Sequence, residues 1–406
     1  MLETKASLLF DSVSANTGDI AMGIASEQIF STLGISTEIV DPLSPDGTAP
    51  LLVGGGELIR NSGDAFYDLF RRRGRHILHA AGIWTTSDNL DYLNDYASVS
   101  TRSTRELERL AETVPSAQVL PCATTMIESP HYEIPGMDSD EPVIGIHLVP
   151  HALRLIEDLI PIVNAIPYRK VFIPFTHYNG DESFMRSLPF DMSNATVLGK
   201  LAPLELHSVL GQMSSVLVSS LHASIFSYSQ NVPFISVHQP KVEYYFNDRG
   251  LGDHLVKSGP ELTEMLRRLS EEKFDFTASV EQDKNDVLEA YKTYARILTD
   301  ERHATPSFSE SDLSSATVPG LEKMRETIFI EQGQHVIADH DLAMAYVENR
   351  RLALANSLME SRRKLSDAEA VVEALEAWWV RRAAMRVKDK LRRARDWVLR
   401  RTPSSA

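Results

Sequence analysis

The chain is poor in cysteine, in positive charge and in long apolar runs, and each shortage excludes a class of protein. Its single cysteine excludes an intrachain disulfide framework and a cysteine-based zinc site. With 41 Lys and Arg against 56 Asp and Glu, the formal charge of −15 argues against a general nucleic-acid binder. No run approaches the roughly 18 apolar residues of a spanning helix, and residues 1–19 lack the basic start of a signal peptide. We therefore expect a cytoplasmic protein that binds no nucleic acid.

Short apolar segments alternate with helical ones over most of the 406 residues, which predicts an α/β fold with mostly parallel sheets. The expected strands are 6–10, 38–40, 50–53, 76–80, 97–100, 118–120, 143–148, 170–174, 196–198, 216–218 and 234–237. The expected helices are 20–33, 106–111, 153–165, 203–212 and 223–229. Because 129–142 is rich in Pro, Gly, Asp and Ser, we interpret it as a linker between domains 1–135 and 136–305.

Glycines and polar residues gather where the first expected strands end, the edge at which open α/β sheets bind ligands. Thr17 and Asp19 follow the first strand, and we expect one of them to cap the next helix. That turn is either an ordinary capped connection or a site where the helix N-terminus receives an anion or hydroxyl. The third strand runs into Gly54–Gly56, which lacks the spacing of a dinucleotide fingerprint and so favours close approach of a ligand or backbone.

Histidines recur at the ends of expected strands, at positions 79, 147, 177, 222 and 238. Their shared edge suggests an active cleft, although a single such histidine is more often structural. Their spacing is not that of metal ligands, so we expect no metal. His222 is the strongest candidate, because it follows a buried strand and a histidine exchanges protons near neutral pH.

The C-terminal region, 306–406, differs in composition from the rest of the chain. A linker is expected at 307–315, and 342–375 has the pattern of a long helix, with apolar residues that suggest a coiled coil. We expect copies of the chain to associate through 340–375. Segment 381–401 holds ten Lys and Arg against two Asp, and tryptophans flank its apolar stripe. Such a helix either binds a membrane surface, here through 376–401, or lies on the acidic body of the protein.

The order and spacing of these motifs resemble the polysaccharide pyruvyl transferases, which move a pyruvyl group from phosphoenolpyruvate onto a sugar as a ketal. The resemblance runs from about Leu8 to Leu251. The motifs that carry it are Asn16–Thr17–Gly18–Asp19, Gly54 to Gly56, Arg102–Ser103, Leu221–His222, Asn231–Val232–Pro233, and Lys241 with Asp248, Gly250 and Leu251. It implies a GT-B-like fold, with two Rossmann-like domains facing across a cleft. The helical C-terminal extension expected from the tail's own pattern lies beyond the resemblance. It also implies a glycan acceptor of the cell surface or its lipid-linked precursor, and neither metal nor dinucleotide cofactor.

The resemblance also assigns roles at the site. It implies His222 as general acid beside the phosphoenolpyruvate. Ketal chemistry also needs a group that orients the sugar or accepts its hydroxyl proton, and we expect the carboxylate of Asp19 to do so. The remaining expected substrate-binding residues are Asn16, Gly18, Gly55, Gly56, Arg102, Ser220, Leu221 and Lys241.

Two positions depart from the family pattern. Ser220 stands where the family usually carries arginine, the natural clamp for a carboxylate or phosphate. Cys122 stands where aspartate is more common. Other cations are then expected to supply the missing charge, namely Arg102, Lys200, Lys241 or Arg249.

Two other functions fit the same residues. One is a GT-B-type glycosyltransferase that uses a nucleotide sugar, because fold alone does not define the donor. The other is a non-catalytic scaffold that assembles partners at the inner face of a membrane through its helical tail. Binding of phosphoenolpyruvate, of a sugar nucleotide or of neither separates the three.

Overall fold

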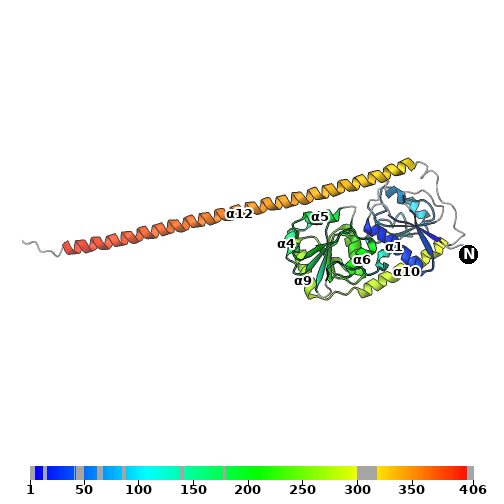
Figure 1. The fold of residues 1–406 in the computed structure, drawn as a ribbon, viewed down its shortest axis with the longest axis horizontal. Helices are drawn as coiled ribbons and strands as arrows, with labels where there is room; N and C mark the ends of the chain where they lie inside the picture. Colours follow the sequence, from blue (N-terminus) through cyan, green and yellow to red (C-terminus); the bar gives the residue numbers. More distant parts are fainter. Residues whose placement is uncertain are drawn as a thin grey trace, which may run out of the picture. The chain divides into compact units, whose positions relative to one another are not determined.

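The computed structural model describes residues 5–11, 16–40, 42, 50–61, 67–84, 88–137, 141–176, 180–299 and 318–399. The chain divides into two compact units, Met1–Met344 and Ala345–Ala406. Figure 1 shows the first unit as sheets covered by helices and the second as part of one long helix. The linker expected at 307–315 and His177 lie outside the described residues.

The first sheet is built from the first third of the chain and has six parallel strands in the order β2-β1-β3-β4-β5-β6. The strands are β1 (Lys5–Leu9), β2 (Ser36–Val40), β3 (Leu51–Gly54), β4 (Ile77–Ala81), β5 (Ser98–Thr101) and β6 (Gln118–Val119). The helices that accompany them are α1 (Thr17–Thr32) and α2 (Thr104–Glu108), with short 3-10 turns η1 (Tyr67–Phe70), η2 (Asp91–Asp95) and η3 (Ala123–Met126).

The second sheet also has six parallel strands, in the order β12-β11-β10-β7-β8-β9. The strands are β7 (Val143–His147), β8 (Arg169–Phe172), β9 (Ala195–Val197), β10 (Ser215–Val218), β11 (Phe234–Val237) and β12 (Leu255–Val256). The helices are α3 (His151–Leu155), α4 (Leu159–Asn164), α5 (Asp181–Ser187), α6 (Pro203–Gly211), α7 (Leu221–Ser229), α8 (Pro240–Asn247), α9 (Gly259–Glu271) and α10 (Thr277–Thr299), with a 3-10 turn η5 (Gly252–His254).

Central strands of both sheets are buried along their whole length, which explains their unbroken apolar sequences. β3, β4, β7, β10 and β11 have no exposed residue, as expected for parallel strands covered on both faces. All the strands expected from the sequence are present within a residue or two. β12 and the helices α5 and α8 to α10 were not anticipated.

α10 follows the second sheet in the chain but packs on the first. Its Tyr291 hydroxyl lies 2.6 Å from Ser26 Oγ of α1, and the Tyr291 ring lies 5.2 Å from that of Phe30. Tyr294 of the same helix contacts His79 in the middle of β4, with 3.3 Å between the hydroxyl and Nδ1. The last helix of the second half therefore ties the two halves together, while the boundaries expected at 135 and 305 stay predictions.

Three helix predictions need correction. The helix expected at 153–165 is two helices, because Asp158 adopts a left-handed conformation with φ of 57° between them. α1 starts at Thr17, so its N-cap is Asn16 and not Thr17 or Asp19. α7 starts at Leu221, which places His222 in the first turn of the helix.

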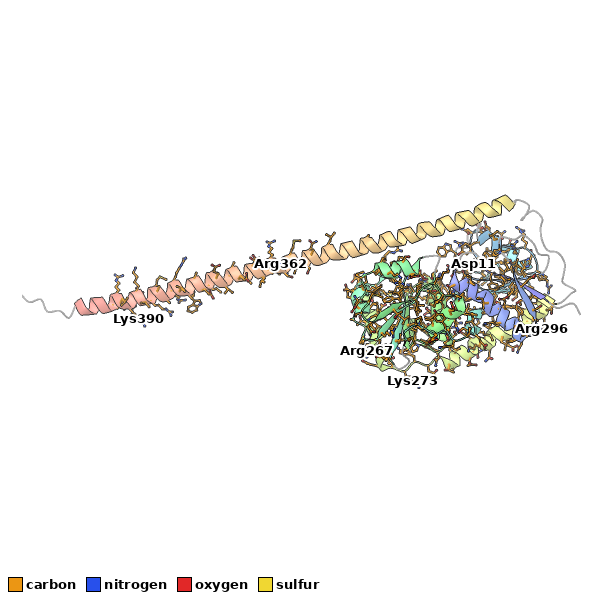
Figure 2. The ribbon with its side chains drawn as sticks, viewed as in Figure 1. Asp11, Arg267, Lys273, Arg296, Arg362 and Lys390 are labelled. Atoms are coloured by element: carbon orange, nitrogen blue, oxygen red, sulfur yellow. The ribbon has the colours of Figure 1, made fainter. Side chains whose placement is uncertain are left out.

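The C-terminal helix α12 (Val318–Leu399) is longer than the expected 342–375 and continues into the basic segment. Its side chains are exposed from 355 to 393, including Arg362 and Lys390 (Figure 2). Among the helices that the structure describes, none is long and apolar enough to cross a membrane.

Candidate functional site

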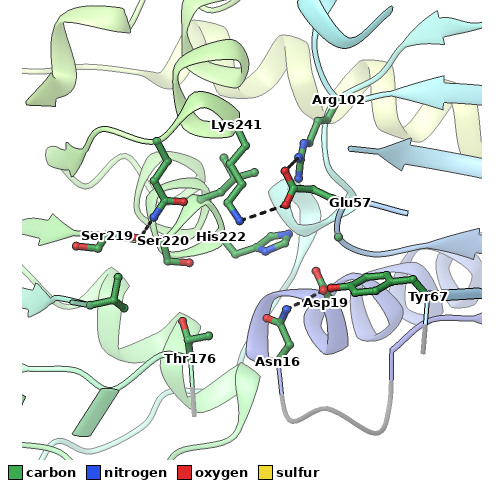
Figure 3. A pocket seen from close by; sticks show the side chains of 14 residues that line it. Asn16, Asp19, Glu57, Tyr67, Arg102, Thr176, Ser219, Ser220, His222 and Lys241 are labelled. Atoms are coloured by element: carbon green, nitrogen blue, oxygen red, sulfur yellow. Dashed lines mark hydrogen bonds and ion pairs between the residues drawn. The ribbon is translucent and has the colours of Figure 1, made fainter. Parts of the chain in front are cut away.

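A pocket of about 140 Å³ lies where strands of both sheets end. The first sheet supplies Asn16 and Asp19 after β1, Gly56 and Glu57 after β3, Tyr67, and Arg102 after β5, and the second supplies Val149, Thr176, Ser219, Ser220, Leu221, His222, Gln239 and Lys241. Figure 3 shows these side chains pointing toward one another from the two halves. Residues far apart in the sequence meet here because the carboxyl ends of parallel strands share one edge.

All ten site residues expected from the sequence are in or against this pocket, and eight of them line it. The other two are glycines that allow close approach. A Cβ on Gly18 would lie 1.9 Å from His222 Nδ1, so only glycine fits there. Gly55 has φ of 100°, and a Cβ on it would lie 3.4 Å from that of Asp19.

His222 sits in the first turn of α7 with its ring buried against the first half of the chain. Its Nε2 lies 3.7 Å from Cys122 Sγ, at the end of β6. Burial lowers the pKa of His222 to about 3, and the positive charges of Arg102 and Lys241 act in the same direction. The imidazole is therefore neutral at physiological pH.

Asp19 lies in the first turn of α1 and is 5% exposed. Asn16 Nδ2 donates a hydrogen bond to Asp19 Oδ2 at 2.7 Å. The pKa of Asp19 is raised to about 7. Burial is the main cause and the charge of Asp11 adds to it, while Lys241 and Arg102 act in the opposite direction. Near pH 7 this carboxyl holds a proton about half of the time, so it can donate or accept one.

The two cations of the pocket are both held by Glu57. Glu57 Oε1 lies 3.4 Å from Arg102 Nη2, and its Oε2 lies 3.8 Å from Lys241 Nζ (Figure 3). Arg102 is also 3.1 Å from Glu106 Oε1. With two cations and two glutamates, this cluster has no net charge.

The other two cations expected to replace the family arginine do not reach the pocket. Arg249 Nε is bound to Asp283 Oδ2 at 2.6 Å in a buried pair. Lys200 is exposed in the loop before α6. Of the four alternatives, Arg102 and Lys241 are therefore the pocket cations among the described residues.

The start of α7 presents hydroxyl groups to the pocket. Ser219 is 2% exposed, and its Oγ has no hydrogen-bond partner among the described residues. Gln239 Nε2 donates to the Ser219 carbonyl at 2.6 Å and thereby holds this turn. The free N–H groups of a helix start favour an anion, so an anionic group placed here would be stabilised.

The predicted row of active-site histidines is not formed. His79 and His147 are fully buried, and His147 Nε2 lies 2.7 Å from Asp181 Oδ2. His238 Nε2 lies 3.1 Å from Glu243 Oε2. Of the four described histidines in that row, His222 alone lines the pocket.

Six lining residues were not anticipated, namely Glu57, Tyr67, Val149, Thr176, Ser219 and Gln239. Glu57 follows the three glycines directly and was within reach of sequence reasoning. In the part of the chain that the structure describes, no cluster of His, Cys, Asp and Glu could hold a metal ion.

Comparison with known proteins gives one family and several distant structures. The model of the family described as polysaccharide pyruvyl transferase matches residues 16–238. No curated protein matches the sequence. Spinosyn forosaminyltransferase has 11% identity and a TM-score of 0.44, with 80% of this chain and 100% of that chain covered. A putative UDP-N-acetylglucosamine 2-epimerase from Listeria monocytogenes has 12% identity and a TM-score of 0.44, with 72% of this chain and 97% of that chain covered.

The two parallel sheets around a shared pocket confirm the expected GT-B-like fold.

Proposed function

The chain belongs to the polysaccharide pyruvyl transferase family, and on this premise we propose that it transfers a pyruvyl group from phosphoenolpyruvate to a sugar of a cell-surface polysaccharide or its lipid-linked precursor. The observation that carries the proposal is the meeting of Asp19 and His222, from opposite halves, with Arg102 and Lys241 in one pocket. Two proton-transferring groups and two cations are what an anionic enol donor requires.

Ketal formation needs one proton delivered to the donor methylene carbon and two protons removed from sugar hydroxyls. In our mechanism, protonated Asp19 gives its proton to the methylene carbon, and neutral His222 takes the proton of the first attacking hydroxyl. The second hydroxyl then closes the ring, the bond to phosphate breaks, and the second hydroxyl proton returns to Asp19. The proton on His222 leaves with the phosphate, which restores the resting site.

This assignment reverses the roles expected from the sequence. Burial lowers the pKa of His222 to about 3 and raises that of Asp19 to about 7, so the proton near neutral pH is favoured on Asp19 over His222. Cys122 contributes to the low pKa of His222. A neutral thiol beside the ring does not stabilise the protonated imidazolium, whereas a carboxylate at this position would.

The His222→Gln variant separates the two assignments. If Asp19 is the acid, residual transfer by His222→Gln falls as the pH rises above about 7, because Asp19 ionises. If Asp19 is the base, the residual rate rises instead. A rising profile would therefore exclude our mechanism.

The donor is held without the family arginine. We propose that Lys241 and the hydroxyls and N–H groups around Ser219 and Ser220 receive its phosphate and carboxylate oxygens. Calorimetric titration with phosphoenolpyruvate tests this, with Lys241→Met as the variant expected to weaken binding. Binding of a sugar nucleotide but not of phosphoenolpyruvate would indicate glycosyl transfer. Binding of neither would favour the non-catalytic scaffold.

We also propose that the C-terminal helix serves attachment and assembly. Trp378 and Trp379 are about half exposed, and the Arg382 guanidinium lies 4.7 Å from the Trp378 ring centre. Aromatic rings beside a basic stretch suit the surface of an anionic membrane, which would place the enzyme near a lipid-linked acceptor. Exposed apolar residues within 340–375 suit association of two copies.

A further inference from the structure

A second cavity, of about 510 Å³, adjoins the pocket described above. The two cavities share Glu57, Gln239 and Lys241 as lining residues. Figure 3 shows Glu57 and Lys241 joined by their ion pair on the side of Arg102. A molecule in the second cavity therefore reaches the polar groups of the first without crossing the protein.

The second cavity carries an exposed indole. Trp84 is 58% exposed, more than any other large apolar side chain in the described part of 5–299. Its backbone is nevertheless held firmly, since its N–H donates to the Ile59 carbonyl at 2.9 Å and Ile83 bridges Ile59. Arg109 Nη1 also donates to the Ile83 carbonyl at 3.1 Å. The Arg60 guanidinium lies 5.5 Å from the centre of the Trp84 ring. An exposed indole on a held backbone beside a polar pocket is a feature of ligand-binding surfaces.

The second aromatic residue of the lining is Tyr244 of α8, and α8 is tied to the first half of the chain. Asp248, just after α8, accepts a hydrogen bond from the Thr104 backbone N–H at 2.6 Å, which joins α8 to α2. The cavity is therefore formed before any ligand arrives. Its lining combines two aromatic rings with carboxylate, amide and ammonium groups.

We propose that this second cavity is the acceptor subsite, in which a pyranose ring packs on Trp84 and Tyr244 and turns its reacting hydroxyls toward Glu57, Gln239 and Lys241. A pyranose has apolar C–H faces, which suit aromatic rings, and a polar rim, which suits carboxylates and amides. The shared wall brings those hydroxyls to the entrance of the donor pocket. This inference rests on the proposed function in taking the acceptor to be a sugar.

Tryptophan fluorescence gives a direct test that does not depend on catalysis. The chain has four tryptophans, and Trp84 is the only one outside the C-terminal helix. In the full chain with Trp378, Trp379 and Trp397 replaced by Phe, emission reports on Trp84 alone. We expect saturable quenching or a blue shift with at least one of a panel of methyl pyranosides of gluco, galacto, manno and 2-acetamido configuration.

Uridine diphosphate is the competing probe, since a nucleobase also stacks on indole. No response to any glycoside, or a response to uridine diphosphate alone, would overturn the acceptor subsite. Failure of phosphoenolpyruvate to bind would instead refute the proposed donor and leave the glycoside response standing.

Steady-state kinetics gives a second, independent test, with the methyl pyranoside that changes the Trp84 fluorescence as acceptor. Trp84→Ala is expected to raise the KM for this acceptor by about 10-fold or more and to leave the KM for phosphoenolpyruvate unchanged. Trp84→Phe should recover most of the loss, because it keeps an aromatic face. The matched control is Met192→Ala, which removes another exposed apolar side chain outside the cavity. An equal rise in the donor KM, or none in the acceptor KM, would contradict the proposal.

Discussion

Replacing Asp19 with asparagine is expected to stabilise the protein at alkaline pH while it abolishes transfer. Burial raises the pKa of this carboxyl from 3.8 to about 7, so the folded protein binds its proton more tightly than the unfolded chain does. Between these two values the free energy of unfolding therefore falls as the pH rises, and above about 7 it stays constant. Asparagine keeps the shape of the side chain and cannot ionise.

The size of the effect follows from the shift. At about 1.4 kcal/mol for each pH unit, the ionised carboxylate costs about 4 kcal/mol at pH 8 and about 1.7 kcal/mol at pH 5. Relative to the unchanged protein, the free energy of unfolding of Asp19→Asn should thus be about 2.5 kcal/mol more favourable to the folded state at pH 8 than at pH 5. In a body of this size that corresponds to about 5 °C in the thermal midpoint.

The assay is thermal unfolding of Asp19→Asn and of the unchanged protein at both pH values, with transfer measured alongside. Asp91→Asn, which alters an exposed aspartate, is the control and should show no pH-dependent difference. If Asp19→Asn shifts the thermal midpoint equally at both pH values, or lowers it at pH 8, the reasoning is refuted. A gain in stability together with loss of activity is the usual trade-off at a site that keeps a buried ionisable group for chemistry.

Three further predictions concern the pocket and the tail. Gly18→Ala should lower kcat by at least about 10-fold in a transfer assay, because its Cβ would displace the His222 ring; unchanged kcat would mean that the ring is not catalytic. Ser220→Arg should tighten phosphoenolpyruvate binding several-fold in calorimetry, because it adds a positive charge beside the neutral cluster of Arg102, Lys241 and the two glutamates. Equal or weaker binding would mean that the donor binds elsewhere. Deletion of 376–406 should abolish sedimentation with anionic liposomes but not alter behaviour with neutral ones, so equal pelleting with anionic liposomes would remove the membrane proposal.

The strands and most of the site could be predicted because their signals are local. A short apolar run such as 216–218 identifies a buried strand, and parallel strands place their following residues on one edge. Asp19 and His222 were found in this way, and so was Arg102. The expected row of histidines is not formed, because His79 lies inside β4 and not after it, and His147 at the end of β7 is buried against Asp181.

The helices were harder to predict where one residue decides the outcome. Asp158 divides the segment 153–165 by taking a positive φ that no periodicity reveals. The 82 residues of α12 show the opposite case, since one continuous helix covers both the expected helix at 342–375 and the basic segment after it. α10 gave no sign in its own sequence of which sheet it would cover.

The sequence by itself determined the α/β alternation, the family motifs and the edge of the sheets at which the site lies, since each depends on neighbouring residues and on a repeating backbone geometry. Only the tertiary structure decided the charges and the shape of that site. Cys122 faces His222 across 100 positions of the chain, and Glu57 joins Arg102 to Lys241. Trp84 becomes a cavity wall only because α8 lies opposite it. A pKa or a cavity depends on which distant groups come together and how much water they exclude, and folding alone determines both.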